Sequence, residues 1–184
     1  MNSDEPWSET GQGAAAERGK LRYLLVSLAV IVLDQWTKWL VELHLPEGVQ
    51  VVVPGLFNLT HVRNTGVAFG LFAVHGVDTS SSWLLTGLGL VALAAVGVYF
   101  GLASARDRSL LVALALVVGG AVGNLIDRVS SGAVTDFIDV YVGTHHWPSF
   151  NVADSAISIG IVLLAIDSLR SRKSHRAASE PQGA

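Results

Sequence analysis

Residues 83–103 read WLLTGLGLVALAAVGVYFGLA and contain no charged side chain. About 20 helical residues cross a hydrocarbon core of about 30 Å, so this run is long enough to span a membrane as a helix. Three other apolar runs approach the same length, over residues 21–42, 109–126 and 153–169. The sequence therefore predicts an all-α membrane protein with four transmembrane helices.

The composition of the 184-residue chain agrees with this prediction. Only 15% of its residues are charged and 51% are hydrophobic, whereas about a quarter of the residues of a soluble globular protein are charged. The formal net charge of −3 leaves no basic surface for nucleic acid, so we expect no nucleic-acid partner. The absence of cysteine excludes a thiol nucleophile, a thiolate metal site and disulfide bonds.

Most lysine and arginine residues lie at or beyond the ends of the apolar runs, on one side of the predicted membrane. They are Arg18, Lys20, Arg22, Arg106, Arg108, Arg170, Arg172, Lys173 and Arg176. The opposite side holds only Arg63 and Arg128. Since loops rich in lysine and arginine stay in the cytoplasm, both termini are predicted there and the loops 43–82 and 127–152 outside.

The first apolar run could instead belong to a cleaved signal peptide. It exceeds the usual length of about 7–15 apolar residues and no A-x-A cleavage site follows it, so we interpret it as a retained helix. The polar segments 1–17 and 174–184 are typical of disordered tails, which the predicted topology places in the cytoplasm.

Two segments of the first outer loop carry patterns of their own. Residues 51–62 read VVVPGLFNLTHV; the β-branched, partly alternating pattern around a Pro-Gly pair predicts a short hairpin. Residues 64–72 are apolar but too short to cross the membrane, which predicts a helix or re-entrant segment at the interface.

Ionisable and amide side chains gather at the outer ends of the predicted helices, where they are costly to bury. The set comprises Asp34, Lys38, Asn124, Asp127, Arg128, Asp136, Asn151 and Asp154. Local structure explains part of it, because Asp34 can pair with Lys38 one turn away, and Asn151 suits the N-cap of the last helix. Four separate segments nevertheless bring polar groups to one depth, so we favour a functional site over salt bridges alone.

Two aspartates that share a proton can hydrolyse a peptide bond, because one acid polarises the carbonyl while the other carboxylate activates water. The low dielectric at a membrane edge favours the shared proton. Asp136 and Asp154 can meet if the second outer loop folds back onto the last helix. Other chemistries fit less well: no G-x-S-x-G elbow occurs, and His145-His146 lacks a metal-ligand spacing, so we expect no metal.

Five blocks follow one another along the chain: DQWTK at 34–38, NTGVAF at 64–69, GNLIDR at 123–128, GAVTDF at 132–137 and FNVADS at 150–155. In these blocks, over about residues 20–170, the chain resembles the lipoprotein signal peptidase family, also called signal peptidase II. The resemblance implies four transmembrane helices, a small extracytoplasmic β-cradle and an interfacial helix, hence a single membrane peptidase domain over residues 18–173. It also implies an aspartic endopeptidase without a cofactor, which cuts before a diacylglyceryl-modified cysteine.

The resemblance assigns a role to each polar position, with Asp136 and Asp154 as the catalytic pair. The substrate-binding positions are Asn64, Asn124, Arg128 and Asn151, and the supporting positions are Asp34, Lys38 and Asp127. The implied partners are diacylglyceryl-modified prolipoproteins and membrane lipids of the bacterial inner membrane, with the active site at the extracytoplasmic edge. We expect a monomer.

A small carrier or channel subunit is the main alternative, with the carboxylates acting as an ion relay. A relay requires acids along the full depth of the membrane, whereas most of these acids gather at the outer edge. A purely structural scaffold leaves the clustered Asn and Asp residues without explanation. A peptidase therefore remains the preferred interpretation.

Overall fold

The computed structural model describes residues 19–65 and 79–179. This part of the chain contains four long helices, all apolar enough to cross a membrane. They are α2 (Leu24–His44), α3 (Thr79–Leu102), α4 (Arg108–Ser131) and α5 (Val152–Ser179). The four predicted transmembrane helices are thereby confirmed, because uninterrupted apolar runs satisfy their backbone hydrogen bonds internally only as helices.

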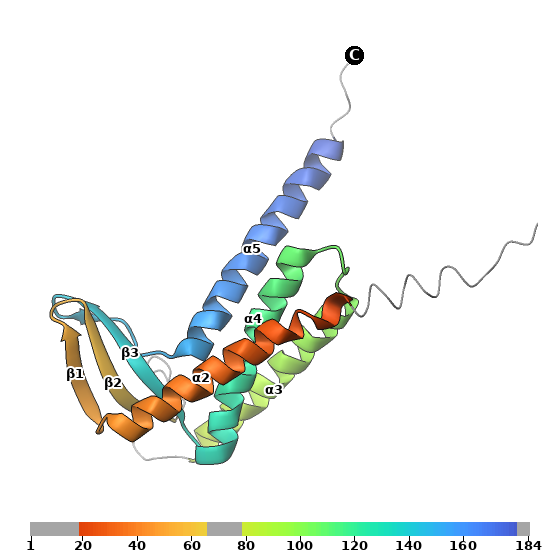
Figure 1. The fold of residues 1–184 in the computed structure, drawn as a ribbon. Coiled ribbons are helices and arrows are strands. Elements are labelled where there is room, and N and C mark those ends of the chain that lie inside the picture. Colours follow the sequence, from red (N-terminus) through yellow and green to blue (C-terminus); the bar gives the residue numbers. More distant parts are fainter. Residues whose placement is uncertain (1–18, 66–78, 180–184) are drawn as a thin grey trace, which may run out of the picture.

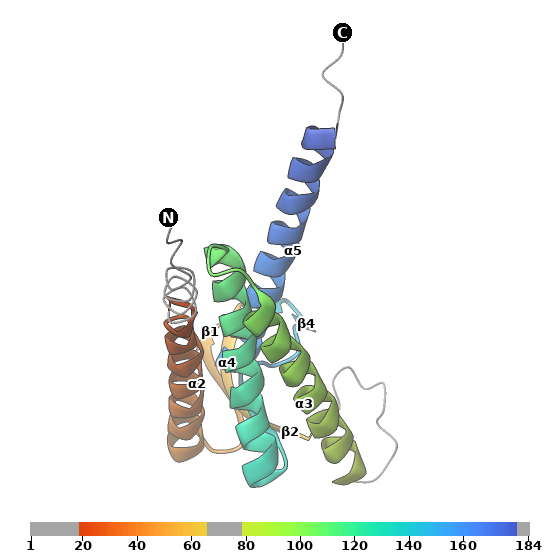
Figure 2. The ribbon, with the colours of Figure 1, turned by 90° about the vertical axis from the view of Figure 1, so that its right-hand side faces the viewer.

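Helix α4 lies between the other helices (Figures 1 and 2). Its Leu111 and Leu114 are fully buried, and its glycines let the neighbouring helices approach closely. A Cβ at Gly120 would collide with the Ala153 carbonyl oxygen of α5, and one at Gly123 would come within 2.6 Å of Asp34 Oδ2 on α2. Small residues at helix contacts are the usual means of packing spans in lipid.

The outward faces of the helices are apolar. More than half of the surface of Leu25, Val32, Trp36, Trp83 and Val91 is exposed. Large apolar side chains in such numbers are unfavourable in water and favourable against lipid tails. The exposed faces therefore agree with a membrane-embedded bundle.

A four-stranded antiparallel sheet lies at one end of the bundle, with strand order β1-β2-β3-β4 (Figure 1). The strands are β1 (Gly48–Val53), β2 (Phe57–Asn64), β3 (Val134–Val142) and β4 (His145–His146). The predicted hairpin is confirmed as β1–β2, and its turn contains Gly55 with φ 81°. Strand β3 comes from the second outer loop and pairs with β2, so the sheet joins the two loops that follow α2 and α4.

Some predicted segments end elsewhere. Helix α5 continues to Ser179, beyond the predicted end of the last span and into segment 174–184, which we expected to be a tail. Asn64 is the last residue of β2. Of the predicted interfacial segment 64–72, the structure describes only Asn64 and Thr65. Residues 66–72 and the predicted N-terminal tail 1–17 lie outside the described residues.

Candidate active site

Asp136 of β3 and Asp154 of α5 line the same cavity, of about 670 Å³, at the sheet end of the bundle. Asn64, Arg128 and the segment 147–150 contribute to the same wall. Residues predicted from separate blocks of the sequence therefore meet at one place. The second outer loop folds back onto the start of α5, as a paired-carboxylate site requires.

The carboxylate of Asp136 is buried and held by amide donors. Asn64 Nδ2 donates to its Oδ2 at 2.9 Å, and Asn151 Nδ2 donates to its Oδ1 at 2.8 Å. Burial and the nearby Asp154 carboxylate raise the pKa of Asp136 to about 6, although the two amide hydrogen bonds act in the opposite direction. A carboxyl group with this pKa holds or releases a proton close to neutral pH.

Asp154 occupies the third position of α5, and Asn151 caps the helix. The Asn151 side chain accepts a hydrogen bond from the Asp154 backbone N–H at 2.9 Å, while Asp154 Oδ2 accepts the Asn151 backbone N–H at 3.3 Å. This reciprocal arrangement is a capping box, in which each side chain satisfies a backbone donor of the first turn. The predicted N-cap is confirmed, and the same Asn151 side chain reaches Asp136.

Asn124 of α4 connects this site to a second polar cluster. Its Nδ2 donates to Asp154 Oδ1 at 2.7 Å, and its Oδ1 accepts hydrogen bonds from Lys38 Nζ at 3.0 Å and from Asn151 Nδ2 at 3.2 Å. Because Oδ1 faces two donors, the amide presents its NH2 group to Asp154.

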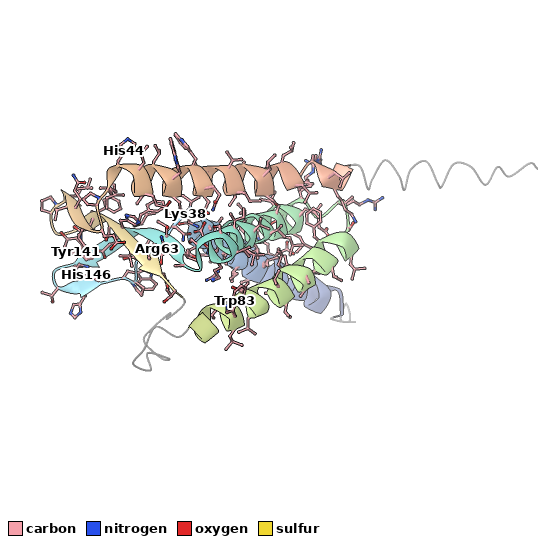
Figure 3. The ribbon with its side chains drawn as sticks, turned by 90° about the horizontal axis from the view of Figure 1, so that it is seen from below. Lys38, His44, Arg63, Trp83, Tyr141 and His146 are labelled. Atoms are coloured by element: carbon pink, nitrogen blue, oxygen red, sulfur yellow. The ribbon has the colours of Figure 1, made fainter. Side chains whose placement is uncertain are left out.

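The second cluster surrounds the buried ammonium group of Lys38. Its Nζ lies 2.8 Å from Asp34 Oδ2, 2.7 Å from Asp127 Oδ2 and 3.0 Å from Asn124 Oδ1. Each of the three N–H donors of a lysine thus has an acceptor. Figure 3 shows Lys38 on the side of α2 that faces the rest of the bundle.

Asp127 forms an ion pair with Lys38 of α2, although Arg128 is its neighbour in the sequence. Consecutive helical residues point in directions about 100° apart, which turns Asp127 toward α2 while Arg128 faces the cavity. Arg128 Nη1 donates to the Asn124 carbonyl oxygen at 3.4 Å. The predicted Asp34–Lys38 pair is confirmed.

Asp34 also contacts helix α5. Its Oδ1 accepts the backbone N–H of Ala153 at 2.9 Å, in the first turn of α5. A carboxylate there satisfies a free donor and lies at the positive end of the helix dipole. The cluster on α2 therefore holds the helix end that carries Asp154.

Three residues beside the site were not identified in the sequence. Gln35 Nε2 donates to Asp127 Oδ1 at 2.8 Å, and Thr135 Oγ1 donates to Glu42 Oε1 at 2.6 Å. Gln35 lies within the block 34–38 and Thr135 within the block 132–137, so the blocks could have indicated both residues. Glu42 lies outside every block and meets Thr135 only after the sheet has formed, so no local pattern marks it.

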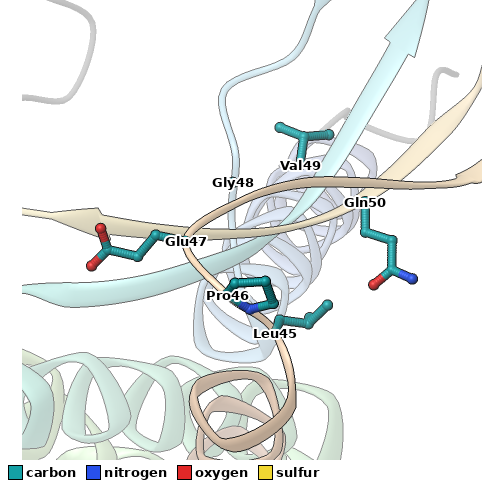
Figure 4. Close-up of a pocket in the computed structure, with 6 residues that line it drawn as sticks. All are labelled: Leu45, Pro46, Glu47, Gly48, Val49 and Gln50. Atoms are coloured by element: carbon teal, nitrogen blue, oxygen red, sulfur yellow. The ribbon is translucent and has the colours of Figure 1, made fainter.

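The other hollows differ from this cavity in their lining. One of about 440 Å³ lies where α2 joins β1 and is lined by residues 45–50, with Glu47 as its one carboxylate (Figure 4). Another, of about 230 Å³, lies behind Lys38 and Asp127. Within the described residues no group of three or more His, Cys, Asp or Glu could hold a metal ion.

Solved structures with the same arrangement of helices and strands indicate the class of protein. One, described as a bacterial membrane enzyme at 2.3 Å resolution, has a TM-score of 0.68 and 30% identity, covering 89% of this chain and 94% of its own. A second bacterial membrane enzyme, at 1.9 Å resolution, has a TM-score of 0.65 and 32% identity, covering 80% and 92%. The fold is thus that of a multi-pass bacterial membrane enzyme.

The family follows from sequence comparison. Residues 26–170 match the model of the family described as Signal peptidase (SPase) II. The lipoprotein signal peptidase of Geobacter metallireducens is 45% identical over 153 residues, which cover 82% of this chain and 92% of the relative. That of Desulforapulum autotrophicum is 49% identical over 148 residues, covering 79% and 90%.

The chain belongs to the signal peptidase II family and is a membrane peptidase that removes signal peptides from prolipoproteins. The resemblance noted in the sequence blocks is confirmed. The carrier and scaffold alternatives are set aside.

Proposed function

We propose that the peptidase is an aspartic endopeptidase in which Asp136 and Asp154 are the catalytic pair. The observation that carries the proposal is the shared cavity, in which two carboxylates are bound by amides rather than by cations. A single proton shared between such acids is the arrangement that activates water against a peptide bond.

In this mechanism a water molecule lies between the two carboxyl groups and the scissile carbonyl. The ionised acid removes a proton from the water as its oxygen attacks the carbonyl carbon, and the protonated acid donates its proton to the carbonyl oxygen. In the second step the acid that took the water proton donates it to the amide nitrogen, while the other, now ionised, acid removes a proton from one hydroxyl of the tetrahedral diol. The C–N bond breaks, and a carboxylic acid and an amine are released. Each acid therefore acts in the opposite role in the second step, and the starting protonation of the pair is restored.

The amides around the acids have distinct roles in this proposal. Asn151 donates to Asp136 and Asn124 donates to Asp154, so the two orient the carboxylates toward each other. Asn64 and Arg128 line the open side of the cavity, where they can bind the peptide backbone or the glyceryl ester. Asp34, Lys38 and Asp127 support Asn124 and the start of α5.

The position of the site favours a lipid-modified substrate taken from the outer leaflet. The sheet lies at one end of the bundle, and the start of α2 and the α3–α4 connection lie at the other (Figures 1 and 2). The cavity is at the sheet end, because Asn64 and Asp136 of the sheet line it. The opposite end carries Lys20, Arg106 and Arg108, so the positive-inside rule places it in the cytoplasm and the site outside. We infer cleavage before a diacylglyceryl-modified cysteine at the outer face of the bacterial inner membrane.

All residues of the proposed site come from one chain. The site is therefore complete in a monomer, and we propose that the monomer is the active form. Its partners are the diacylglyceryl-modified prolipoprotein and the surrounding lipids, and the chemistry requires no cofactor.

The catalytic pair is tested by conservative substitutions in purified, detergent-solubilised enzyme. Asp136→Asn and Asp154→Asn should each lower cleavage of a lipidated precursor at least about 1,000-fold while the thermal unfolding transition persists, because removal of one carboxylate removes the acid–base step. The matched control is Asp127→Asn, another buried acid, which should retain activity. An active Asp136→Asn enzyme, or inactivation by a chelator with rescue by zinc, would refute the pair.

The role of the lipid is tested by comparing lipidated and unlipidated forms of one precursor in the same detergent. The acyl chains remain in an apolar phase before and after binding, so their benefit is to place the scissile bond at the depth of the acids. We expect the unlipidated form to lose mainly kcat. Equal kinetics for the two forms would remove the lipid from the mechanism.

A further inference from the structure

A second buried carboxylate lies on the strand that carries Asp136. Asp139 of β3 accepts a hydrogen bond from Asn58 Nδ2 at 2.7 Å, and both of its oxygens lie 3.0 Å from His146 Nδ1 on β4. Because a carboxylate offers only acceptors, Nδ1 carries the hydrogen. Burial raises the pKa of Asp139, but the hydrogen bonds from Asn58 and His146 outweigh this effect and bring the pKa below its ordinary value.

Tyr141 extends this contact to the β1–β2 turn. Its ring stacks on the His146 ring, with centroids 4.8 Å apart and an interplanar angle of 12°. Its hydroxyl oxygen accepts the backbone N–H of Gly55 at 2.6 Å. Figure 3 shows Tyr141 and His146 together at the end of the sheet farthest from the helices. His146 is therefore held by an ionised acid in the plane of its ring and by an aromatic face.

The segment directly after His146 is part of the wall of the catalytic cavity. Residues 147–150 line the cavity beside Asp136 and Asp154. Their backbone is attached to β3 at both ends, by the Trp147 N–H to the Val140 carbonyl at 2.8 Å and by the Phe150 N–H to the Ile138 carbonyl at 3.0 Å. We call residues 147–150 the cavity wall.

The cavity wall leads directly into the catalytic machinery. Residue 151, which follows it, donates to the Asp136 side chain and caps the helix that carries Asp154. The chain therefore leaves β3, turns through β4, forms the wall and enters α5. Within the turn and β4, His146 is linked back to β3 by its contact with Asp139 and by its stacking on Tyr141.

We infer that Asp139 and His146 are positioning residues, which set the cavity wall against the peptide segment of the prolipoprotein. The inference rests on the proposed catalytic pair, since it takes this cavity as the place where the peptide binds. Neither residue touches the reacting atoms. Their contribution is to substrate affinity, because a wall that shifts changes the fit of the bound peptide while the bonds that orient the two acids remain.

The test measures kcat and KM separately for the full-length enzyme with a lipidated precursor. His146→Ala and Asp139→Ala should each raise KM about five- to tenfold and leave kcat within about twofold. The reason is that the Asp139–His146 contact orders the cavity wall against which the substrate peptide binds. His146→Asn should restore KM to within about twofold of the wild type, since its Nδ2 can replace Nδ1 as the donor. A role in stability alone would change the unfolding temperature and leave KM unmoved.

The matched control is His145→Ala on the same two-residue strand. The His145 side chain is exposed and makes no hydrogen bond or ring contact within the described part of the chain, so its loss should leave KM unchanged. An unchanged KM in folded His146→Ala, or an equal rise in His145→Ala, would overturn the inference. If Asp136→Asn is inactive in the same assay, such a result leaves the catalytic pair intact; if Asp136→Asn is active, the proposed function itself fails.

Discussion

Two pairs of aspartates lie on opposite sides of Asn124 and differ in what neutralises them. Asp34 and Asp127 share the ammonium group of Lys38, at 2.8 and 2.7 Å. Asp136 and Asp154 are bound by amides and a backbone N–H, and among the described residues no lysine or arginine forms a salt bridge with either. A carboxylate that shares a buried lysine is fixed in an ion pair that holds the helices together, whereas a carboxylate held only by amides has no counter-ion to leave before it exchanges a proton.

The comparison also separates the two pairs in energy. A buried ion pair contributes little net stability when complete but is costly to break, since the remaining charge has no partner. Amide donors stabilise a carboxylate less strongly than a cation does, and they leave its protonation state open. The same protein thus uses one acidic residue type for two purposes, and the neighbour decides which.

The largest expected effect is the loss of the cation. Lys38→Met leaves Asp34 and Asp127 buried without a cation and removes a donor to Asn124, so the unfolding free energy should fall by about 3–5 kcal/mol, with loss of activity. Thermal unfolding in detergent measures the change. Adding Asp127→Asn to Lys38→Met should recover part of the stability, because one unpaired charge disappears; a double variant no more stable than the single one would contradict the ion-pair interpretation.

A dependence of stability on pH distinguishes Asp136. Its pKa of about 6 lies above the 3.8 of an unperturbed aspartate, so the folded state binds this proton more tightly. The resulting stability is present below pH 4 and is lost as the pH rises through 6, by roughly 3 kcal/mol. Asp136→Asn has no carboxyl group to titrate and does not lose this stability. As the pH rises from 4 to 7, the unfolding temperature of Asp136→Asn should therefore increase relative to that of the wild type.

Asp139 provides the matched control on the same strand. Its pKa is lowered on balance, so its contribution is present at neutral pH and is lost as the pH falls through the lowered pKa. As the pH rises from 4 to 7, the unfolding temperature of Asp139→Asn should therefore decrease relative to that of the wild type, the opposite of the change in Asp136→Asn. Identical profiles for Asp136→Asn and Asp139→Asn would contradict the distinction.

Giving the proposed catalytic pair, Asp136 and Asp154, a cation should make it resemble the pair that shares Lys38. Asn64→Lys places an ammonium group beside Asp136 in place of the amide that now lies 2.9 Å away. An adjacent opposite charge lowers a carboxyl pKa by about 1–3 units, so kcat/KM near neutral pH should fall about 100-fold and recover at lower pH. Asn64→Ala, which loses only the hydrogen bond, should fall about tenfold; equal losses without recovery at low pH would argue against the protonation effect.

The smallest effect is expected at Asp127. Asp127→Asn keeps an oxygen for the Gln35 amide and leaves Lys38 paired with Asp34. The loss should be about 1–2 kcal/mol of stability and less than about tenfold in turnover. A stable, membrane-inserted Asp127→Asn enzyme without activity, beside an active Asp136→Asn, would show that Asp136 is not one of the catalytic acids.

Local patterns in the sequence predicted much of this molecule. Each helix follows from an apolar run of sufficient length, the β1–β2 hairpin from its Pro-Gly turn, and the Asn151–Asp154 cap from residues three positions apart. These features depend on neighbours in the sequence, whose geometry a helix or a turn determines.

The features that were missed depend on distant parts of the chain. Strand β3 forms because β2 offers it an edge, and Asp127 meets Lys38 because α4 packs against α2. Asp127 and Arg128 are adjacent in the sequence, but helix geometry alone could not show which neighbouring helix Asp127 faces. The catalytic roles came from the family blocks, since residue types at the membrane edge left more than one pairing of acids open.

The glycine at position 120 sets the spacing of two helices beside the proposed catalytic pair. Its missing side chain lets α4 rest on the Ala153 carbonyl oxygen, one residue before Asp154. At that spacing the short Asn124 side chain spans the gap with a 2.7 Å hydrogen bond. One methyl group at position 120 would act as a spacer and leave Asn124 too short to reach. The spacing of α4 and α5 thus determines whether Asn124 reaches Asp154, and the absence of a side chain at position 120 allows that spacing.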